Sequence, residues 1–542
     1  MKRFYGTIPR TADQDTAIGK IDYRLNDLNS FSFDVNYQHF YSPNGIQTGA
    51  VVTSGGALNS NGYDDVNTRY GRAAWTYTPT PTIVNEARFG WFKDRQFDAV
   101  NNNLLDPVFG VTSVSVNNVG IGGANYLPRI QPSENRYEAA DNFSYVIGKH
   151  NLKFGFDYFN TEDYTNQLVN GNGNYSYTNA NAFALDYSGN ATNAHRYTNY
   201  SQAFGNRAVD AKLNELSLFA QDQFKIRPNL TLYYGIRYER TFFPTPPLVN
   251  PDYPQTGRIP EDTSNFAPRL GYAWSFNNNK TVVRSGYGLF YGRYPGAMVN
   301  SLFTTNNLYQ QSFSLSNAAQ IAIGPVFPNV LPAPPAAGAG AATVGFAVNN
   351  LRTPYSQQAD FGVQQALGKN TSITVSYLWS AASQMLTVRD LILRNPTHSV
   401  TYNILDSSNN VAGTFTSPVY LDIDRIDRHY ARVLQVENGG KSSYNGLAVQ
   451  VERRLSHGLE GSLSYTWSHA IDDNLGTAGS NLFFGNNAPS TLYNGNYRAE
   501  RGDGSLDQRQ RLVINWIYSP TFTRRSDFFS RYLINNWQLA AR

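Results

Sequence analysis

The stretch that decides the fold is Leu216–Glu239, LSLFAQDQFKIRPNLTLYYGIRYE. In its second half, apolar positions alternate strictly with polar or small ones: the first set is Leu230, Leu232, Tyr234, Ile236 and Tyr238, and the second is Thr231, Tyr233, Gly235, Arg237 and Glu239. Successive side chains of a strand point to opposite faces, so this pattern indicates a strand with one apolar and one polar face. Arg227-Pro228-Asn229 separates the two halves, and Pro and Asn favour tight turns. The sequence therefore predicts an antiparallel hairpin over 213–226 and 230–240.

The same unit, two strands joined by a short turn, recurs along the chain. The other predicted pairs are 16–25 with 31–40, 67–78 with 83–95, 136–147 with 151–160, 264–275 with 281–291, 354–367 with 371–380, and 443–455 with 458–469, followed by a strand over 506–519 and a further start at 535. Most turns contain Asn, Gly, Pro or Lys, as hairpin turns do. The segments between the pairs are long: 41–66, 96–135, 161–212, 241–263, 292–353, 381–442 and 470–505.

This alternation of short and long connections predicts an all-β fold, a transmembrane antiparallel β-barrel with short periplasmic turns and long extracellular loops. A soluble sandwich or propeller gives no reason for it. The composition agrees, because charged residues are 15% of the 542 residues, against about 25% in typical globular chains. Aromatic residues reach 14%, and several predicted strands end in Trp or Tyr, which are typical of barrel girdles. The mean hydropathy is nevertheless −0.44, because neutral Asn-, Gly- and Tyr-rich loops offset the apolar strand faces.

Several function classes are disfavoured. The chain has no Cys, which excludes disulfides and Cys-based metal sites. Its net charge is +4 with no basic run, so nucleic acid is not an expected partner. The N-terminus shows no apolar signal-peptide region, and no apolar stretch is long enough for a transmembrane helix. No nucleophile–base set or metal-ligand spacing appears, so we predict a non-enzyme with no catalytic, cofactor-binding or metal-binding residues.

Two short motifs invite other interpretations. Arg501-Gly502-Asp503 spells an adhesion tripeptide, but it stands within RAERGDGSLDQRQR, a segment leading into a strand, and we do not favour an adhesion role for it. Asp422, Asp424 and Asp427 are clustered acids suited to calcium. Interleaved arginines favour a salt-bridged turn instead.

Several segments, taken in order, resemble one family. They are Leu216–Glu239; NFAPRLGYAW over Asn265–Trp274 with KTVVRSGYGLFYGR over Lys280–Arg293; PYSQQADFGVQQALGKNTSITVSYLW over Pro354–Trp379; SYNGLAVQVERRLSHGLEGSLSYTWSHAIDD over Ser443–Asp473; RAERGDGSLDQRQRLVIN over Arg498–Asn515; and Asn536-Trp537-Gln538-Leu539. Together they resemble TonB-dependent outer-membrane receptors, and among these the large-looped, Oar-like branch.

The resemblance also sets an expectation for the domain organisation. Members of the family carry an N-terminal plug of over a hundred residues, and their barrels have 22 strands, whereas about 16 are recognised here. We therefore expect residues 1–542 to be a partial TonB-dependent receptor β-barrel domain, with the plug domain and the C-terminal closing strands absent from this chain.

What the resemblance implies about function is active uptake of a scarce solute across the cell outer membrane, after capture by the extracellular loops. The implied partners are outer-membrane lipid, a plug domain, TonB, and a small-molecule, oligosaccharide or peptide ligand. Strand parity assigns six candidate side chains to the lumen: Asp34, Asn36, Arg237, Glu239, Arg284 and Glu452. The alternative hypothesis is a surface-binding or adhesion protein that uses the barrel as an anchor.

Overall fold

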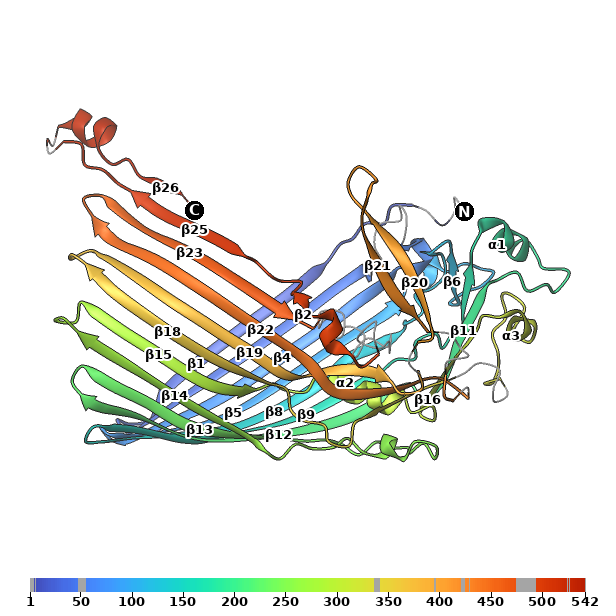
Figure 1. Ribbon diagram of the computed structural model, residues 1–542, viewed down its shortest axis with the longest axis horizontal. Helices are drawn as coiled ribbons and strands as arrows, with labels where there is room; N and C mark the ends of the chain where they lie inside the picture. The colour runs from blue at the N-terminus through green and yellow to red at the C-terminus, as the bar shows by residue number, and fades with distance from the viewer. Residues whose placement is uncertain are drawn as a thin grey trace.

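A large curved sheet of slanting strands dominates the structure, a computed structural model of the chain (Figure 1). The structure describes residues 4, 6–46, 55–335, 342–393, 396–420, 425–427, 429–473, 494–523, 525 and 527–541. Short turns gather at one end of the sheet and long loops at the other (Figure 1). These two ends are called the turn end and the loop end below.

The strands of the large sheet run antiparallel to their sequence neighbours, with one parallel pairing between β17 and β22. Their bounds are β1 Asp13–Arg24, β2 Asn29–Ile46, β4 Gly62–Thr80, β5 Ile83–Val100, β8 Arg129–Ile147, β9 His150–Asn166, β12 Ala208–Arg227, β13 Leu230–Phe242, β14 Asn265–Phe276, β15 Thr281–Tyr291, β17 Ala342–Ala347, β18 Tyr355–Leu367, β19 Thr371–Asp390, β22 Tyr430–Ser456, β23 Leu459–Asp472, β24 Gly502–Asp503, β25 Gln510–Tyr518 and β26 Leu539–Ala541. Every predicted strand has a counterpart, although the last one begins at Leu539 rather than at 535 because a π-helix, Ser530–Ile534, precedes it, and this confirms the all-β class.

Many of these strands extend beyond their predicted limits, and they do so mainly at the loop end. β22 begins at Tyr430 rather than at 443, and β19 continues to Asp390 rather than to 380. A membrane crossing needs only about 9–11 tilted residues, so these extensions are not required to span the bilayer. The backbone pairing of these strands continues beyond the bilayer. The alternation of apolar and polar residues is weaker there, because these residues no longer face lipid, and the sequence therefore does not mark the full length of the strands.

The tight turns follow the predicted chemistry. Asn277, Asn278 and Asn279 have φ values of 54°, 54° and 62°, and Gly368 has a φ of 76°. Asn and Gly adopt this left-handed conformation at low cost, unlike β-branched residues. The two hairpins β14–β15 and β18–β19 are thereby closed by short connections.

The sheet has two chemically distinct faces. One, called the apolar face, exposes large aliphatic and aromatic side chains such as Val35, Ile236, Leu270 and Phe361. The other, called the polar face, is the face to which Arg237 belongs. Residues that pair directly across neighbouring strands lie on the same face, so the cross-strand partners of Arg237 belong to it as well. Exposure of so many large apolar side chains along a continuous wall is the pattern expected of a lipid-facing surface.

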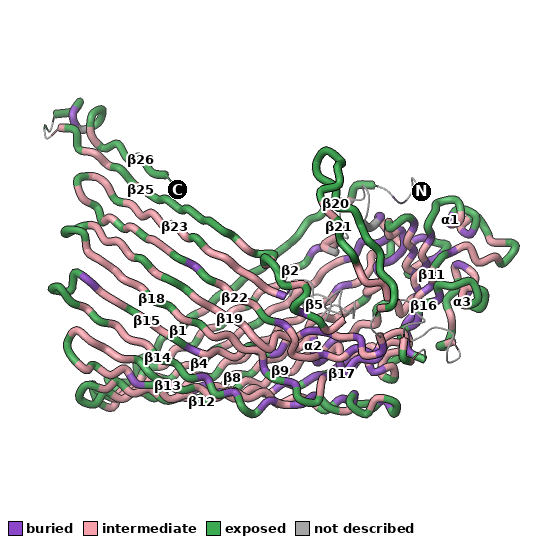
Figure 2. The backbone as a smooth tube through the Cα atoms, in the orientation of Figure 1, coloured by how far each residue is buried: buried purple, intermediate pink, exposed green. Residues whose placement is uncertain are grey.

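Burial is concentrated at the loop end, where Figure 2 shows most of the buried backbone. There a six-stranded sheet in the order β16-β11-β10-β6-β7-β3 forms a separate unit, called the head. Its strands are β3 Gly55–Gly56, β6 Ser113–Val116, β7 Val119–Gly120, β10 Asn174–Tyr177, β11 Asn199–Gly205 and β16 Gln310–Leu315, with helices α1 Ala180–Tyr187 and α3 Ala318–Ala322 beside them. Its core is rich in buried rings, among them Tyr175, Tyr177, Phe183, Tyr200 and Phe327.

A second hydrophobic core joins the segment 292–354 to the wall at the loop end. Helix α2, Gly296–Thr304, packs its buried residues Met298, Val299, Leu302 and Phe303 against β12, β19 and β22. β17 of the same segment pairs with β22. Five strands of the sheet lie between β12 and β22, so this segment bridges distant parts of the wall at the loop end.

One hairpin stands apart from both sheets. It consists of β20 His398–Leu405 and β21 Val411–Val419, which pair only with each other among the described residues (Figure 1). No helix in the described part of the chain has the length and hydropathy needed to cross a membrane.

Candidate functional site

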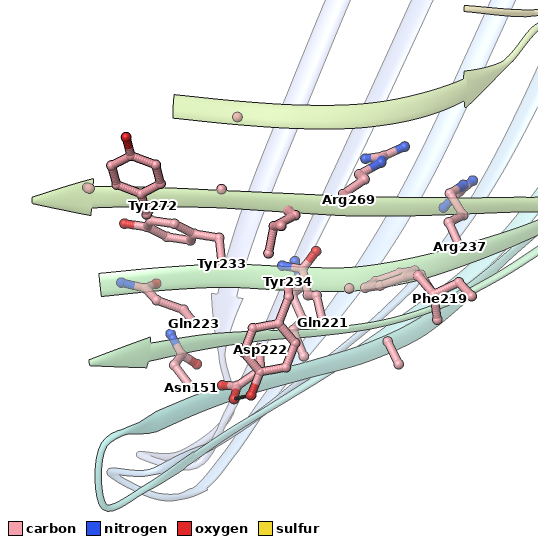
Figure 3. A pocket seen from close by; sticks show the side chains of 18 of the residues that line it. Asn151, Phe219, Gln221, Asp222, Gln223, Tyr233, Tyr234, Arg237, Arg269 and Tyr272 are labelled. Atoms are coloured by element: carbon pink, nitrogen blue, oxygen red, sulfur yellow. Dashed lines mark hydrogen bonds between the residues drawn. The ribbon is translucent and has the colours of Figure 1, made fainter. Parts of the chain in front are cut away.

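A hollow in the described part of the wall lies on the polar face near the turn end. It has a volume of about 780 Å³ and is lined by β9 and by the consecutive strands β12 to β15, with Ser144 from β8 and Asp360 from β18 (Figure 3). We call it the wall cleft. Neutral polar side chains that line it are Asn151, Gln221, Gln223 and Tyr233.

Glycine forms the floor of the wall cleft. Gly235, Gly271 and Gly286 occupy polar-face positions on β13, β14 and β15, and Gly271 pairs directly with Gly286. A Cβ on Gly271 would come within 2.9 Å of the Ser285 carbonyl oxygen, and one on Gly286 within 2.8 Å of Asp360 Oδ1. Glycine in a strand interior weakens the strand and marks places of close approach, and at these three positions no side chain rises from the polar face.

Four cations surround this floor: Lys153, Arg237, Arg269 and Arg284. Figure 3 shows Arg237 and Arg269 pointing to the same side of the sheet, and Asp222 and Tyr234 pointing to the other. Among the charged residues that line the cleft from the polar face, Asp360 is the acidic one.

Arg237 belongs to an ion-pair ladder above the cleft. Its Nη1 lies 3.2 Å from Asp157 Oδ2 and its Nε lies 2.5 Å from Glu239 Oε1. Asp157 is also 3.9 Å from Arg88 Nη2. Arg237 is thus held by two carboxylates.

The other three cations have no carboxylate within ion-pair distance among the described residues. Arg269 lies over the ring of Phe290, with its guanidinium carbon 4.4 Å from the ring centroid, and this contact orients it without neutralising it. Lys153 is half-buried, whereas Arg269 and Arg284 are exposed. The wall cleft therefore carries an excess of positive charge.

Asp222 touches the cleft only from the other side of the sheet. Its Oδ2 accepts a hydrogen bond from the Tyr234 hydroxyl at 2.6 Å and lies 2.6 Å from His150 Nδ1. The His150 ring stacks on Phe224 with centroids 4.3 Å apart. This polar cluster lies on the apolar face near the turn end.

The six predicted lumen residues all occupy the polar face, but the structure brings only some of them together. Arg237 and Arg284 line the wall cleft, and Glu239 pairs with Arg237. Asp34 and Asn36 lie on β2, where Asp34 pairs across the strands with Lys20 and Arg72. Glu452, on β22, accepts a hydrogen bond from Gln450.

Sequence reasoning missed Lys153, Arg269 and the glycine floor. Lys153 and Arg269 also stand at polar positions of alternating strands, so the same parity argument applies to them. The signal for the floor was glycine at polar-face positions of three consecutive strands, as in YYGIRYE, RLGYAW and RSGYGLF. Only the register shows that these glycines meet.

Other charged clusters are explained by internal pairing. His469, Asp503 and Asp507 converge closely enough to suggest a metal site, yet Arg509 contacts Asp503 at 2.9 Å and Asp507 at 2.5 Å. Asp503, the last residue of the adhesion-like tripeptide, is thus already engaged. In the predicted acidic loop, Asp422 and Asp424 lie outside the described residues, and Asp427 contacts His429.

Solved structures with a similar fold are outer-membrane proteins. The outer membrane transporter YddB from Escherichia coli superposes with a TM-score of 0.57 at 13% identity, over 93% of this chain and 54% of that one. The FrpB iron transporter from Neisseria meningitidis gives a TM-score of 0.52 at 13% identity, over 94% of this chain and 58% of that one. The chain thus spans little more than half the length of the structures it matches. No curated protein matches the sequence.

At such low identity these likenesses establish the fold alone. Both neighbours are named as transporters, not as enzymes. The sequence itself matches the outer membrane beta barrel domain family over residues 2–542. Because that match extends over nearly the whole chain, the protein localises to the cell outer membrane, and its short turns and long loops are the periplasmic and extracellular connections of a barrel wall. The chain belongs to the outer membrane β-barrel domain family.

Proposed function

We propose that this chain is the barrel portion of a TonB-dependent transporter of the Oar-like branch, which takes up a scarce solute across the outer membrane. The observation that carries the proposal is the wall cleft. A barrel that served only as an anchor would have no need for a glycine-floored, cation-rimmed hollow on the face opposite to the lipid. The six polar-face residues named above line the lumen in this proposal.

The partners of the proposed transporter follow from its mechanism. The extracellular loops capture the solute, and a plug domain occupies the lumen until TonB, driven by the inner-membrane potential, displaces it. The polar face then meets first the plug and afterwards the passing solute. The ordered head supports this division of labour, because its packed core holds the loop end in a fixed shape around the mouth.

Uptake measured in living cells tests this proposal. The complete gene product that contains this chain is expressed in a Gram-negative host, and candidate solutes are supplied at limiting concentration. We expect uptake that disappears when TonB is deleted or when the proton-motive force is collapsed. Uptake that continues at the same rate without TonB would refute the proposal.

The hairpin β20–β21 favours a second candidate function, adhesion. Val400, Tyr402, Ile404 and Phe415 lie exposed on one face of it, and Tyr402 stands directly opposite Phe415. Rigid aromatic side chains on a protruding surface suit binding to sugars or proteins. Replacing residues 398–419 with a Gly/Ser linker separates the two functions: loss of cell or matrix adhesion with intact solute uptake would support the adhesive role.

A further inference from the structure

The wall cleft has the features of a built ligand site. The hollow exists because three adjacent strands place glycine on the same face, where a Cβ on Gly235, Gly271 or Gly286 would force a neighbouring atom to move. Neutral hydrogen-bonding groups, Gln221, Gln223 and Tyr233 among them, stand around this floor.

The strand register determines how far apart the cations lie across this hollow. Lys153 pairs with Gln221, Gln221 with Gly235, and Gly235 with Arg269, so all four residues stand in one row across β9, β12, β13 and β14. With neighbouring strands about 4.8 Å apart, the Cα atoms of Lys153 and Arg269 lie roughly 14 Å from each other. Arg284 pairs with Ala273 and therefore stands closer to the turn end than Arg269. A ligand that contacts all three must extend across several strands.

The charge balance decides what kind of ligand fits. Arg237 is neutralised by Asp157 and Glu239, but Lys153, Arg269 and Arg284 lack a carboxylate partner among the described residues. Guanidinium groups bind carboxylate and phosphate oxygens through paired hydrogen bonds, and a walled cleft strengthens this attraction relative to open water. The cleft sets one carboxylate, Asp360, against these three cations, so a neutral sugar would leave a net positive charge and a cation would be repelled.

We propose that the wall cleft binds an oligoanion, a solute that carries at least two carboxylate or phosphate groups. Lys153, Arg269 and Arg284 receive its negative groups, the glycine floor admits its body, and the amide and phenol groups bind its neutral oxygens. This inference names the substrate class of the proposed transporter and rests on that function for the meaning of the site, but the binding itself can be measured without TonB.

Direct binding to the purified, detergent-folded chain tests the proposal. Tripolyphosphate and propane-1,2,3-tricarboxylate serve as probes that represent the two anion chemistries, glycerol serves as a neutral probe, and binding is measured by isothermal titration calorimetry. The variants are Lys153→Gln/Arg284→Gln and, as a matched control, Arg72→Gln, which removes a polar-face cation outside the cleft. Circular dichroism and heat-modifiable gel mobility establish that each variant is folded.

We expect at least one of the two anions to bind, glycerol not to bind, and the affinity to fall at higher salt. The double variant should lose at least tenfold in affinity, whereas Arg72→Gln stays within twofold of the parent chain. A Gly286→Ala variant, which narrows the floor, should also weaken binding, and Asp360 can move aside so that folding is preserved.

A Glu-rich peptide serves as a further probe. Three results would overturn the proposal: no anion binding by the folded chain, an equal loss of affinity in Arg72→Gln and in the double variant, or binding of the Glu-rich peptide when neither small anion binds. The last result would identify the ligand as an acidic protein segment held in the lumen. Because none of these measurements uses TonB, they fail or succeed independently of the uptake assay.

Discussion

Tyr175 anchors the aromatic core of the head, and its removal is expected to unfold the head while leaving the barrel wall intact. Its side chain is fully buried. The ring centroid lies 4.7 Å from that of Tyr200, 5.0 Å from that of Tyr197 and 5.2 Å from that of Phe327. Its hydroxyl donates a hydrogen bond to the Asn329 carbonyl.

The cost of Tyr175→Ala follows from this packing. Truncating a buried aromatic side chain to alanine costs about 3–5 kcal/mol, and the buried carbonyl that loses its donor adds to this cost. One factor of ten in an equilibrium constant corresponds to about 1.4 kcal/mol, so the local unfolding equilibrium of the head shifts by about 10²- to 10⁴-fold. The wall strands share no core with Tyr175 and should keep their stability.

Hydrogen–deuterium exchange with mass spectrometry measures both effects in one sample. Amide protection in β6 and β10 should fall by the factor above, while protection in β12 and β13 stays unchanged. Tyr402→Ala, at an exposed site on the β20–β21 hairpin, is the matched control and should change neither region. Unchanged protection in β6 and β10, or an equal loss in β12 and β13, would refute the view of the head as a separately stabilised unit.

Three more predictions concern ionisation of a buried tyrosine, a charge placed on either face of the wall, and a buried ion pair. Burial raises the pKa of Tyr200 to about 12, from an ordinary value of 10, so the head is expected to lose stability as pH rises from 10 to 12; phenolate absorbance and proteolysis would follow this loss. Ile236→Lys places a charge on the apolar face and should cost about 2–4 kcal/mol in denaturant unfolding from liposomes, whereas Gln221→Lys on the polar face should cost far less. Arg196→Met removes the cationic partner, at 2.6 Å, of the buried Asp186, which keeps only the hydrogen bond from the Tyr177 hydroxyl, and should destabilise the head by about 3–5 kcal/mol, seen as faster exchange in α1; unchanged exchange would show that this pair adds nothing.

The strands and turns were predictable because their determinants are local. A lipid-facing wall requires an apolar residue at every second position, and this alternation is readable in segments such as 230–240. The turns were predictable for a similar reason, since the left-handed conformations of Asn277–Asn279 and Gly368 depend on residue type more than on neighbours.

The head was not predictable from the same kind of pattern. Its strands are short, and β6 and β10 pair in parallel although about sixty residues separate them. Tyr175 and Phe327 meet in one core from two different loops. No local periodicity marks such contacts, and the Asn-, Gly- and Tyr-rich composition of these segments is equally typical of solvated loops.

The wall cleft lies between these two cases. Parity alone put Arg237, Glu239 and Arg284 on the polar face, and it would have put Lys153 and Arg269 there as well. Parity cannot say which of these residues are neighbours, because that depends on the register between strands. Asp34 and Glu452 have the same parity and yet lie away from the cleft.

By itself the sequence determined the strands, their turns, their two faces and hence the barrel wall, since each depends on residues close together in the chain and on contact with lipid. The tertiary structure alone decided that the loops build a packed head and that three glycines meet beneath unpaired cations. Those features arise from pairing between distant segments, where the free energy comes from contacts that no single stretch of sequence contains.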